Sequence, residues 1–160
     1  MPGGFVLASG YGLKRPTGDL NCIAVVPCEQ VGVILSVAGR DSPLARKHGL
    51  CVQYVTVAEI PENYEERLRQ ILAGRFAKLR LWGLEVHDLV LTKLTRNHPI
   101  DDSDVRDLAK LGVLDPTVLL ERYQKELRPC LPAPERHDTT LELWLEYLKD
   151  QPPGVGSAVR

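Results

Sequence analysis

The sequence predicts one α/β (α+β) domain with a small mixed sheet followed by a helical half. Two observations support this fold class. Up to about residue 85, apolar runs typical of strands are mixed with helical periods, whereas from about 86 to 150 every apolar period is helical. The 160-residue length fits one domain spanning residues 1–150. The Pro- and Gly-rich residues 151–160 are expected to form a disordered tail.

Three strands are expected in the first part. Residues 20–26 form a continuous apolar run with β-branched members, which is typical of a strand buried on both faces. Residues 50–57 alternate between apolar and polar side chains, as do residues 76–84. Lys78 and Arg80 favour an edge position for the last of these strands.

Helical segments separate these strands. Residues 5–13 are apolar and small, and the pattern leaves open whether they form a short helix or a strand. Residues 43–48 suggest a short helical turn, and residues 63–72 suggest a helix. Residues 29–38 predict a helix whose apolar, inward set is Val31, Val33, Ile34 and Val37.

Four helices are expected in the second part. The first covers residues 87–96, and the second covers residues 104–111 and ends at Gly112 in the C′ position. Asp115 and Pro116 form an N-cap and N1 pair that opens a third helix to Leu127. Thr139 and Glu142 match a capping box for the last helix, which runs to about Leu148.

Composition narrows the functional classes. A formal net charge of −1 gives no support for a large nucleic-acid footprint. No apolar run reaches the roughly 20 residues that span a bilayer, and no basic segment typical of a signal peptide opens the chain, so we expect a cytoplasmic protein without a membrane partner. The four cysteines form no CxxC pair and are interpreted as reduced thiols, and the four histidines lack ligand spacing. Trp82 and Trp144 are interpreted as core or interface anchors.

Three segments together resemble a known family. Gly3-Gly4 precedes Arg15-Pro16-Thr17-Gly18-Asp19-Leu20-Asn21, which is similar to the Gly-Gly and Asp-x-Asp signature of the DNA polymerase β nucleotidyltransferase superfamily. Residues 87–96 and 101–108 resemble the "DL…KL…R…D..D…L" stretch of an uncharacterised bacterial nucleotidyltransferase-like family, related to abortive-infection nucleotidyltransferases that act as toxins. The resemblance extends from Gly3 to Leu148 and implies a small mixed sheet of the nucleotidyltransferase type.

The resemblance implies a nucleoside triphosphate and Mg²⁺ as ligands. Nucleotidyl transfer uses two Mg²⁺ ions, which prefer carboxylate oxygens, and residues i and i+2 of a strand point to one face. Asp19 and Asn21 therefore stand at the metal positions. Gly3 and Gly4 would approach the triphosphate, and Lys93 would neutralise phosphate charge. Arg15, Thr17, Asp101 and Asp104 complete the expected cofactor-binding set.

The sequence departs from the family pattern in two ways. Asn21 is neutral, and the candidate for a third carboxylate is the amide Gln53, because Glu59 lies past the strand end. The metal clamp has thus lost two of its three charges, which weakens Mg²⁺ binding and leaves Asp19 to repel a triphosphate. Only Met1 and Pro2 precede the glycine pair, so the chain is apparently shortened at its start, and a sheet edge left uncovered favours a homodimer or a protein partner.

Structural alternatives remain open at each of these positions. Gly3-Gly4 suits a flexible terminus, Asp19 suits a turn cap, and Lys93, placed away from the apolar helix face, suits an ordinary solvated lysine. Asp101, Asp102 and Asp104 suit helix capping, which is compatible with an ion pair to Lys93 or Arg96.

Three functions follow. We favour a degenerate nucleotidyltransferase-like protein with weak or no catalysis, serving as a binding or toxin–antitoxin-type module. The alternative is an active Mg²⁺-dependent enzyme that transfers a nucleotidyl group to RNA or protein. The third is an unrelated α/β domain.

Overall fold

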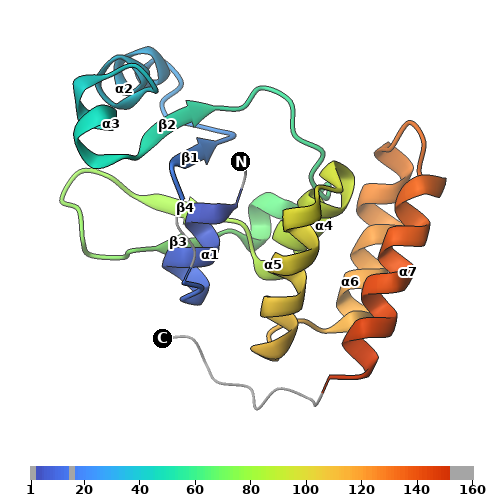
Figure 1. Cartoon of the computed structure of the whole chain (residues 1–160). Coiled ribbons are helices and arrows are strands. Elements are labelled where there is room, and N and C mark those ends of the chain that lie inside the picture. The colour runs from blue at the N-terminus through green and yellow to red at the C-terminus, as the bar shows by residue number, and fades with distance from the viewer. Residues whose placement is uncertain (1–2, 15–16, 152–160) are drawn as a thin grey trace. The chain divides into compact units, whose positions relative to one another are not determined.

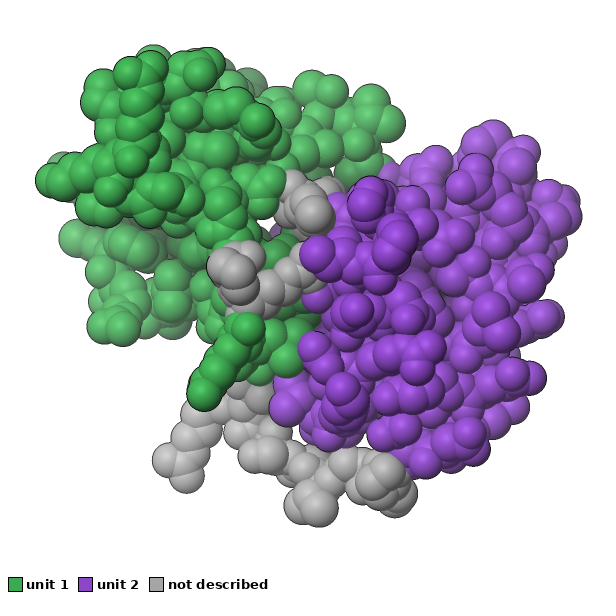
Figure 2. Space-filling view, viewed as in Figure 1, with its two compact units in different colours: residues 1–58, 70–83 green, residues 59–69, 84–160 purple. Residues whose placement is uncertain are grey.

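The structure is a computed structural model that describes residues 3–14 and 17–151. It is a mixed α/β fold whose chain divides into two compact units (Figure 2). Unit 1 comprises residues 1–58 and 70–83, and unit 2 comprises residues 59–69 and 84–160.

The elements of unit 1 are α1 (Gly4–Tyr11), β1 (Asp19–Cys22), α2 (Gln30–Ala38), α3 (Pro43–His48), β2 (Cys51–Tyr54), β3 (Arg69–Ile71, whose first residue is assigned to unit 2) and β4 (Leu81–Gly83).

Two short parallel strands form the centre of unit 1. β1 pairs with β2 in parallel, with Asp19 opposite Cys51 and Asn21 opposite Gln53. Parallel neighbours need a crossover, and α2 and α3 supply it beside β2 (Figure 1). β3 and β4 form a second two-stranded sheet among the described residues.

Helices make up unit 2. They are α4 (Val86–Arg96), α5 (Pro99–Lys110), α6 (Pro116–Arg122) and α7 (Glu135–Lys149), with the 3-10 turns η1 (Tyr64–Arg67) and η3 (Arg128–Cys130) and the π-helical η2 (Tyr123–Leu127). α7 packs on α4, α5 and α6. The buried side chains of this unit are mainly apolar and include Leu89, Leu94, Leu108, Leu119, Leu127 and Trp144. The helical half expected after residue 85 therefore has its own hydrophobic core.

Most expected elements are present. Residues 4–11 resolve the open choice at the start in favour of a helix, and α3 and α4 follow the sequence pattern closely. The N-cap at Asp115 is confirmed, because its carboxylate accepts hydrogen bonds from the backbone N–H groups of Thr117 and Val118. Gly112 has the positive φ of a C′ residue, as expected. The helix predicted from residue 104 begins earlier, at Pro99, whose fixed φ suits the first helical turn.

Four element predictions were wrong. The strand expected at residues 20–26, buried on both faces, is limited to Asp19–Cys22, whose residues are only half-buried, and Val26 is exposed. Residues 63–72 form only the turn η1 and the strand β3, because Arg67 bonds to Asp88 and Glu126 of unit 2 and the helix pattern stops there. Only residues 81–83 of the strand predicted at 76–84 pair, since β3 offers three residues as partner. The last helix starts at Glu135 after Pro134, so the expected capping pair of Thr139 and Glu142 lies inside it.

The prediction that Val33 and Val37 of α2 face inward was wrong. Val33 is 56% exposed and Val37 is 57% exposed, and no residue of this helix is fully buried. Val31 and Ile34 instead share the half-buried side with Leu35 and Ala38. Trp144 is buried in the core as expected, whereas Trp82 is 55% exposed and is not a core residue. The tail predicted at 151–160 lies outside the described residues apart from Gln151. None of the helices within the described ranges is both long and apolar enough to cross a membrane.

Candidate functional site

The start of α1 lies against the segment that leads into β1. Gly3 has φ 97°, in the left-handed region that favours glycine, and it precedes the first helical turn. A Cβ on Gly4 would lie 3.1 Å from Oγ1 of Thr17, which is closer than ordinary contact. Thr17 in turn donates a hydrogen bond to the carbonyl of Asp19 at 2.9 Å. The two glycines therefore have structural reasons to be glycine, and the helix start, Thr17 and Asp19 come together.

The paired strands bring three polar side chains to one face. Asp19 and Asn21 are two residues apart on β1, so their side chains point to the same side of the strand. Gln53 lies directly opposite Asn21 on β2, and strands in a sheet are about 4.8 Å apart. Cys51 lies opposite Asp19, and its thiol donates a hydrogen bond to the Gly18 carbonyl at 3.5 Å. The face thus carries one carboxylate and two amides.

Asn21 has a buried side-chain nitrogen for which the described residues offer no hydrogen-bond partner. Gln53 makes a single long contact through Nε2, 3.8 Å from the sulfur of Cys51. Carboxylates only accept hydrogen bonds when ionised, whereas amides also donate them. This pair of amides is therefore better suited to an oxyanion or a carbonyl than to a bare cation.

No cluster that could hold a metal ion appears within residues 3–14 and 17–151. There, no three His, Cys, Asp or Glu side chains come together closely enough to coordinate one. Asp19 and Asn21, the expected metal positions, together supply one carboxylate and one amide, and Gln53 adds a second amide. Mg²⁺ usually binds through one or two carboxylates, waters and substrate phosphates, so this donor set fits a two-metal clamp poorly. Arg15, expected beside the phosphates, lies outside the described residues.

Lys93, Asp101 and Asp104 form a buried ionic cluster in unit 2. The Lys93 side chain is 2% exposed, and its ammonium lies 3.1 Å from Asp101 Oδ1 and 2.6 Å from Asp104 Oδ2. The alternative of a solvated lysine is therefore wrong, because α5 covers this side of α4 with two carboxylates. The cluster lies in a different unit from Gly3, Gly4, Thr17, Asp19 and Asn21.

Asp101 has two structural roles. Its carboxylate accepts a hydrogen bond from the backbone N–H of His98 at the start of α5, which is the expected capping role. It also pairs with both Lys93 and Arg96. Burial alone would raise the pKa of Asp101, but the hydrogen bond from Arg96 and the charge of Lys93 lower it below its ordinary value.

A second ionic network surrounds Asp88 and was missed by sequence reasoning. Asp88 is fully buried and accepts two hydrogen bonds from Arg67, at 2.8 and 3.0 Å, and one from Arg122 at 3.0 Å. Arg67 also bonds to Glu126, which fixes the segment 59–69 to the helices. Asp88 does belong to the "DL" motif, but its two arginine partners are 21 and 34 positions away, so spacing gave no signal for them.

His87 also belongs to this network and is buried. Its Nε2 accepts a hydrogen bond from the backbone N–H of Asp115 at 2.8 Å, so Nδ1 carries the proton and donates to Glu85 at 2.9 Å. Burial alone would raise the pKa of Glu85, but the bonds from His87 and Arg122 lower it to about 2. The buried acidic and basic residues between Glu85 and Asp104 thus hold the helices of unit 2 together.

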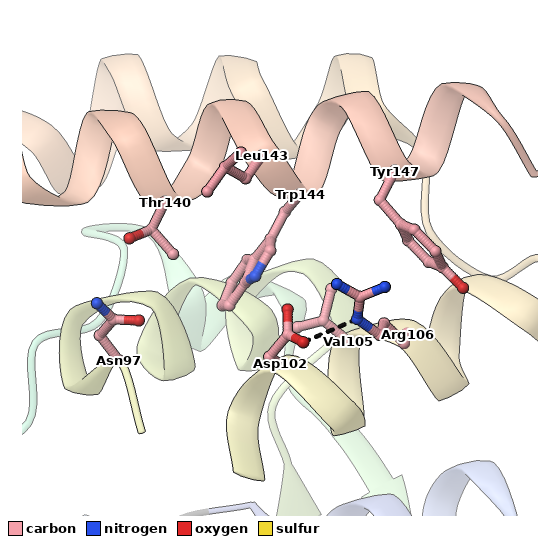
Figure 3. A pocket seen from close by; sticks show the side chains of 8 residues that line it. All are labelled: Asn97, Asp102, Val105, Arg106, Thr140, Leu143, Trp144 and Tyr147. Carbon is pink, nitrogen blue, oxygen red and sulfur yellow. Dashed lines mark hydrogen bonds and ion pairs between the residues drawn. The ribbon is translucent and has the colours of Figure 1, made fainter. Parts of the chain in front are cut away.

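A separate hollow lies between α5 and α7 within unit 2. Its volume is about 350 Å³, at the small end for ligand pockets. Figure 3 shows Trp144 reaching from α7 toward α5 and Arg106 beside Asp102, with which it forms an ion pair at 2.7 Å. The guanidinium also lies 4.6 Å from the centre of the Tyr147 ring. None of the described residues expected to bind the nucleotide or the metal lines this hollow.

Comparison with known protein families identifies the chain. Residues 3–151 match the family described as nucleotidyltransferase of unknown function (DUF6036), and the match covers nearly the whole chain. Neither curated proteins nor solved structures gave a match. The chain therefore belongs to this family of nucleotidyltransferases of unknown function.

Proposed function

We propose that this chain is a degenerate nucleotidyltransferase-like protein that binds a nucleoside triphosphate through unit 1 without transferring its nucleotidyl group. The observation that carries the proposal is the register of β1 and β2, which sets Asn21 opposite Gln53 on the face that holds Asp19. Two-metal catalysis needs carboxylates that hold both ions, because the ions stabilise the charge on the attacking and leaving oxygens. One carboxylate beside a pair of amides is insufficient for that clamp.

Binding without metal is compatible with the same residues. The backbone N–H groups at the start of α1 and the Thr17 region offer hydrogen-bond donors next to Asp19. The amides of Asn21 and Gln53 add donors that carboxylates at these positions would lack. Such a site would hold phosphate oxygens directly and would use no bridging ion. Asp19 then opposes binding, because its charge repels the phosphates.

The motifs also support a proposal about the superfamily and the biological role of the chain. We assign the sheet unit to the type found in the DNA polymerase β superfamily, and we place the function near that of abortive-infection and toxin–antitoxin modules. The support is the Gly-Gly helix start followed by Asp19 on the next strand. Lys93 is not part of the proposed site, because its ammonium is already bound by two carboxylates.

The second candidate is an active Mg²⁺-dependent enzyme that modifies RNA or protein. Asp19 favours it, since this residue opens β1 two positions after Thr17, which lies against Gly4, and the resemblance puts the first metal ligand at this position. The two candidates differ in the role of that carboxylate. In the active enzyme Asp19 holds the metal and strengthens triphosphate binding, whereas in the degenerate protein it weakens binding.

Isothermal titration calorimetry of the wild type and Asp19→Asn tests this difference in sign. Each common nucleoside triphosphate is titrated in EDTA and again in Mg²⁺. We expect saturable binding that does not require Mg²⁺ and that becomes about three- to tenfold tighter in Asp19→Asn, as expected for removing one nearby like charge. Binding that requires Mg²⁺ and weakens in the variant would support the active enzyme. No binding by either protein would contradict both candidates.

A further inference from the structure

Helix α2 presents an uncharged apolar face that the described residues of unit 1 leave exposed. Its sequence from Gln30 to Ala38 contains no charged residue. The side that contacts β2 and α3 consists of half-buried residues, and the opposite side is exposed over Gly32, Val33, Ser36 and Val37. Val33 and Val37, both more than half exposed, thus form an apolar patch on one helix face, and such patches are typical of interaction surfaces.

Opposite charges mark the two ends of this face. Glu29 precedes Val33 by four positions, and Val33 precedes Val37 by four, so the three residues lie along one stripe of the helix. Arg40 follows Gly39 just beyond the other end of the helix. Both charged residues are exposed, and within the described residues neither of them forms an ion pair. The pattern along the face is therefore acidic, apolar, basic.

We propose that α2 is a self-association surface that pairs antiparallel with α2 of a second copy of this chain. A two-fold axis through the middle of the helix makes each copy present the same patch to the other. Val33 and Val37 then pack between the corresponding residues of the partner copy. Glu29 of each copy meets Arg40 of the partner subunit, so a charge pattern that is unpaired in one chain becomes complementary in two.

The composition of the face argues for this occupant. A nucleic acid needs a basic stripe, which the exposed residues of α2 lack. Gly32 and Ser36 are small and lie beside the two valines, so another helix can approach closely. Leu44 of α3, a helix that contacts α2, is also exposed. A nine-residue helix is only about 13 Å long, so the interface is small and the dimer is expected to dissociate in the micromolar range.

Sedimentation equilibrium across the micromolar range tests the pairing on the full chain. The wild type should pass from monomer to dimer mass, and Val33→Asp/Val37→Asp should remain monomeric. Val57→Asp is the matched control, because Val57 is also an exposed valine of unit 1 but lies outside α2. Circular dichroism checks that each variant is folded. A wild type that stays monomeric, or a dimer that survives the double substitution, would overturn the proposal.

A charge exchange tests the antiparallel arrangement without altering the apolar face. Glu29→Arg or Arg40→Glu alone should weaken dimerisation about tenfold, since each substitution turns two ion pairs of the symmetric dimer into like-charge contacts. The combination Glu29→Arg/Arg40→Glu should restore the wild-type dissociation constant. If the combined variant is as weak as the single variants, α2 does not pair in this way. This test stands even if the aspartate variants fail to fold.

Discussion

At the scale of single residues, Lys93 differs most from what its motif suggests. A lysine in a nucleotidyltransferase-like motif suggests a phosphate ligand, yet this ammonium is buried between Asp101 and Asp104. Removing it leaves two buried carboxylates with less compensation, which is far more costly than losing an exposed ion pair. The motif therefore reflects the stability of the helical unit.

Lys93→Ala should lower the free energy of unfolding by about 3–5 kcal/mol, as measured by urea denaturation. Lys110→Ala is the matched control, because Lys110 forms an exposed ion pair with Asp107, three positions away on α5. That substitution should cost less than about 0.5 kcal/mol. Equal effects of the two substitutions would contradict the buried cluster.

Glu85 predicts how stability depends on pH. Its pKa in the folded chain is about 2, below the value of about 4.3 of an unfolded chain, so its contribution is complete above pH 4.3 or so. As pH falls toward 2, Glu85 loses its charge and up to about 3 kcal/mol of stability disappears. Glu85→Gln should be less stable at neutral pH and should show a flatter loss over this window in thermal melts. An unchanged slope in Glu85→Gln would show that the network around Arg122 does not depend on this charge.

At the scale of elements, local capping signals predicted some helix starts and misplaced others. Asp115 followed by Pro116 identified the start of α6 because the cap is local, and its bonds run only to the next three residues. Thr139 and Glu142 have the same kind of spacing but lie inside α7. There, Pro134 opens the helix and Asp138 is held by Arg128 and Tyr123, contacts that no local pattern specifies.

Substitutions of Asp115, a cap in the structure, and of Thr139, a predicted cap that lies inside α7, should separate these cases. Asp115→Ala should destabilise the protein by about 1 kcal/mol, because two backbone N–H groups at the start of α6 lose their acceptor. Thr139→Ala, inside α7 and exposed, should change stability by less than about 0.5 kcal/mol. Thermal melts of both variants provide the comparison. A larger cost for Thr139 would restore the capping box as the start of the last helix.

The sheet and its site were predictable to different degrees. Sequence patterns located β1 and β2, and strand periodicity assigned Asp19 and Asn21 to one face of the sheet. The expectation that Asn21 and Gln53 stand at metal positions came from the resemblance to nucleotidyltransferases and not from periodicity. The partners of Arg67 and Asp88 were not predictable, since those ion pairs join residues far apart in the sequence. The exposed side of α2 was also not predicted. This helix contains no charged residue, so its sequence does not show which side faces the solvent.

At the scale of the whole molecule, apolar burial is concentrated in one unit. Unit 2 contains most of the fully buried side chains, whereas exposed large apolar residues such as Val33, Phe76 and Trp82 are mostly in unit 1. Local stability follows buried apolar contacts and ionic networks. The helical unit is therefore expected to be the stable part of this nucleotidyltransferase-family protein.

Hydrogen exchange measured by mass spectrometry tests this distribution. Peptides from α4, α5 and α7 should exchange slowest, and peptides from β1, α2 and β2 should exchange faster in dilute protein. Protection of α2 should rise at concentrations where the dimer forms, while that of α7 stays constant. Uniform protection over both units would mean that the chain unfolds as one cooperative body, contrary to this prediction.

We propose that this member of the family has lost the metal clamp. The most direct test is whether replacing Asp19 strengthens or weakens the binding of a nucleoside triphosphate. The measurement is the dissociation constant for a nucleoside triphosphate in wild type and Asp19→Asn, in EDTA and in Mg²⁺. We expect binding that is independent of Mg²⁺ and tighter in the variant, because a negative charge on the face of Asn21 and Gln53 has been removed. Binding that requires Mg²⁺ and is lost in Asp19→Asn would contradict it and identify Asp19 as a working metal ligand.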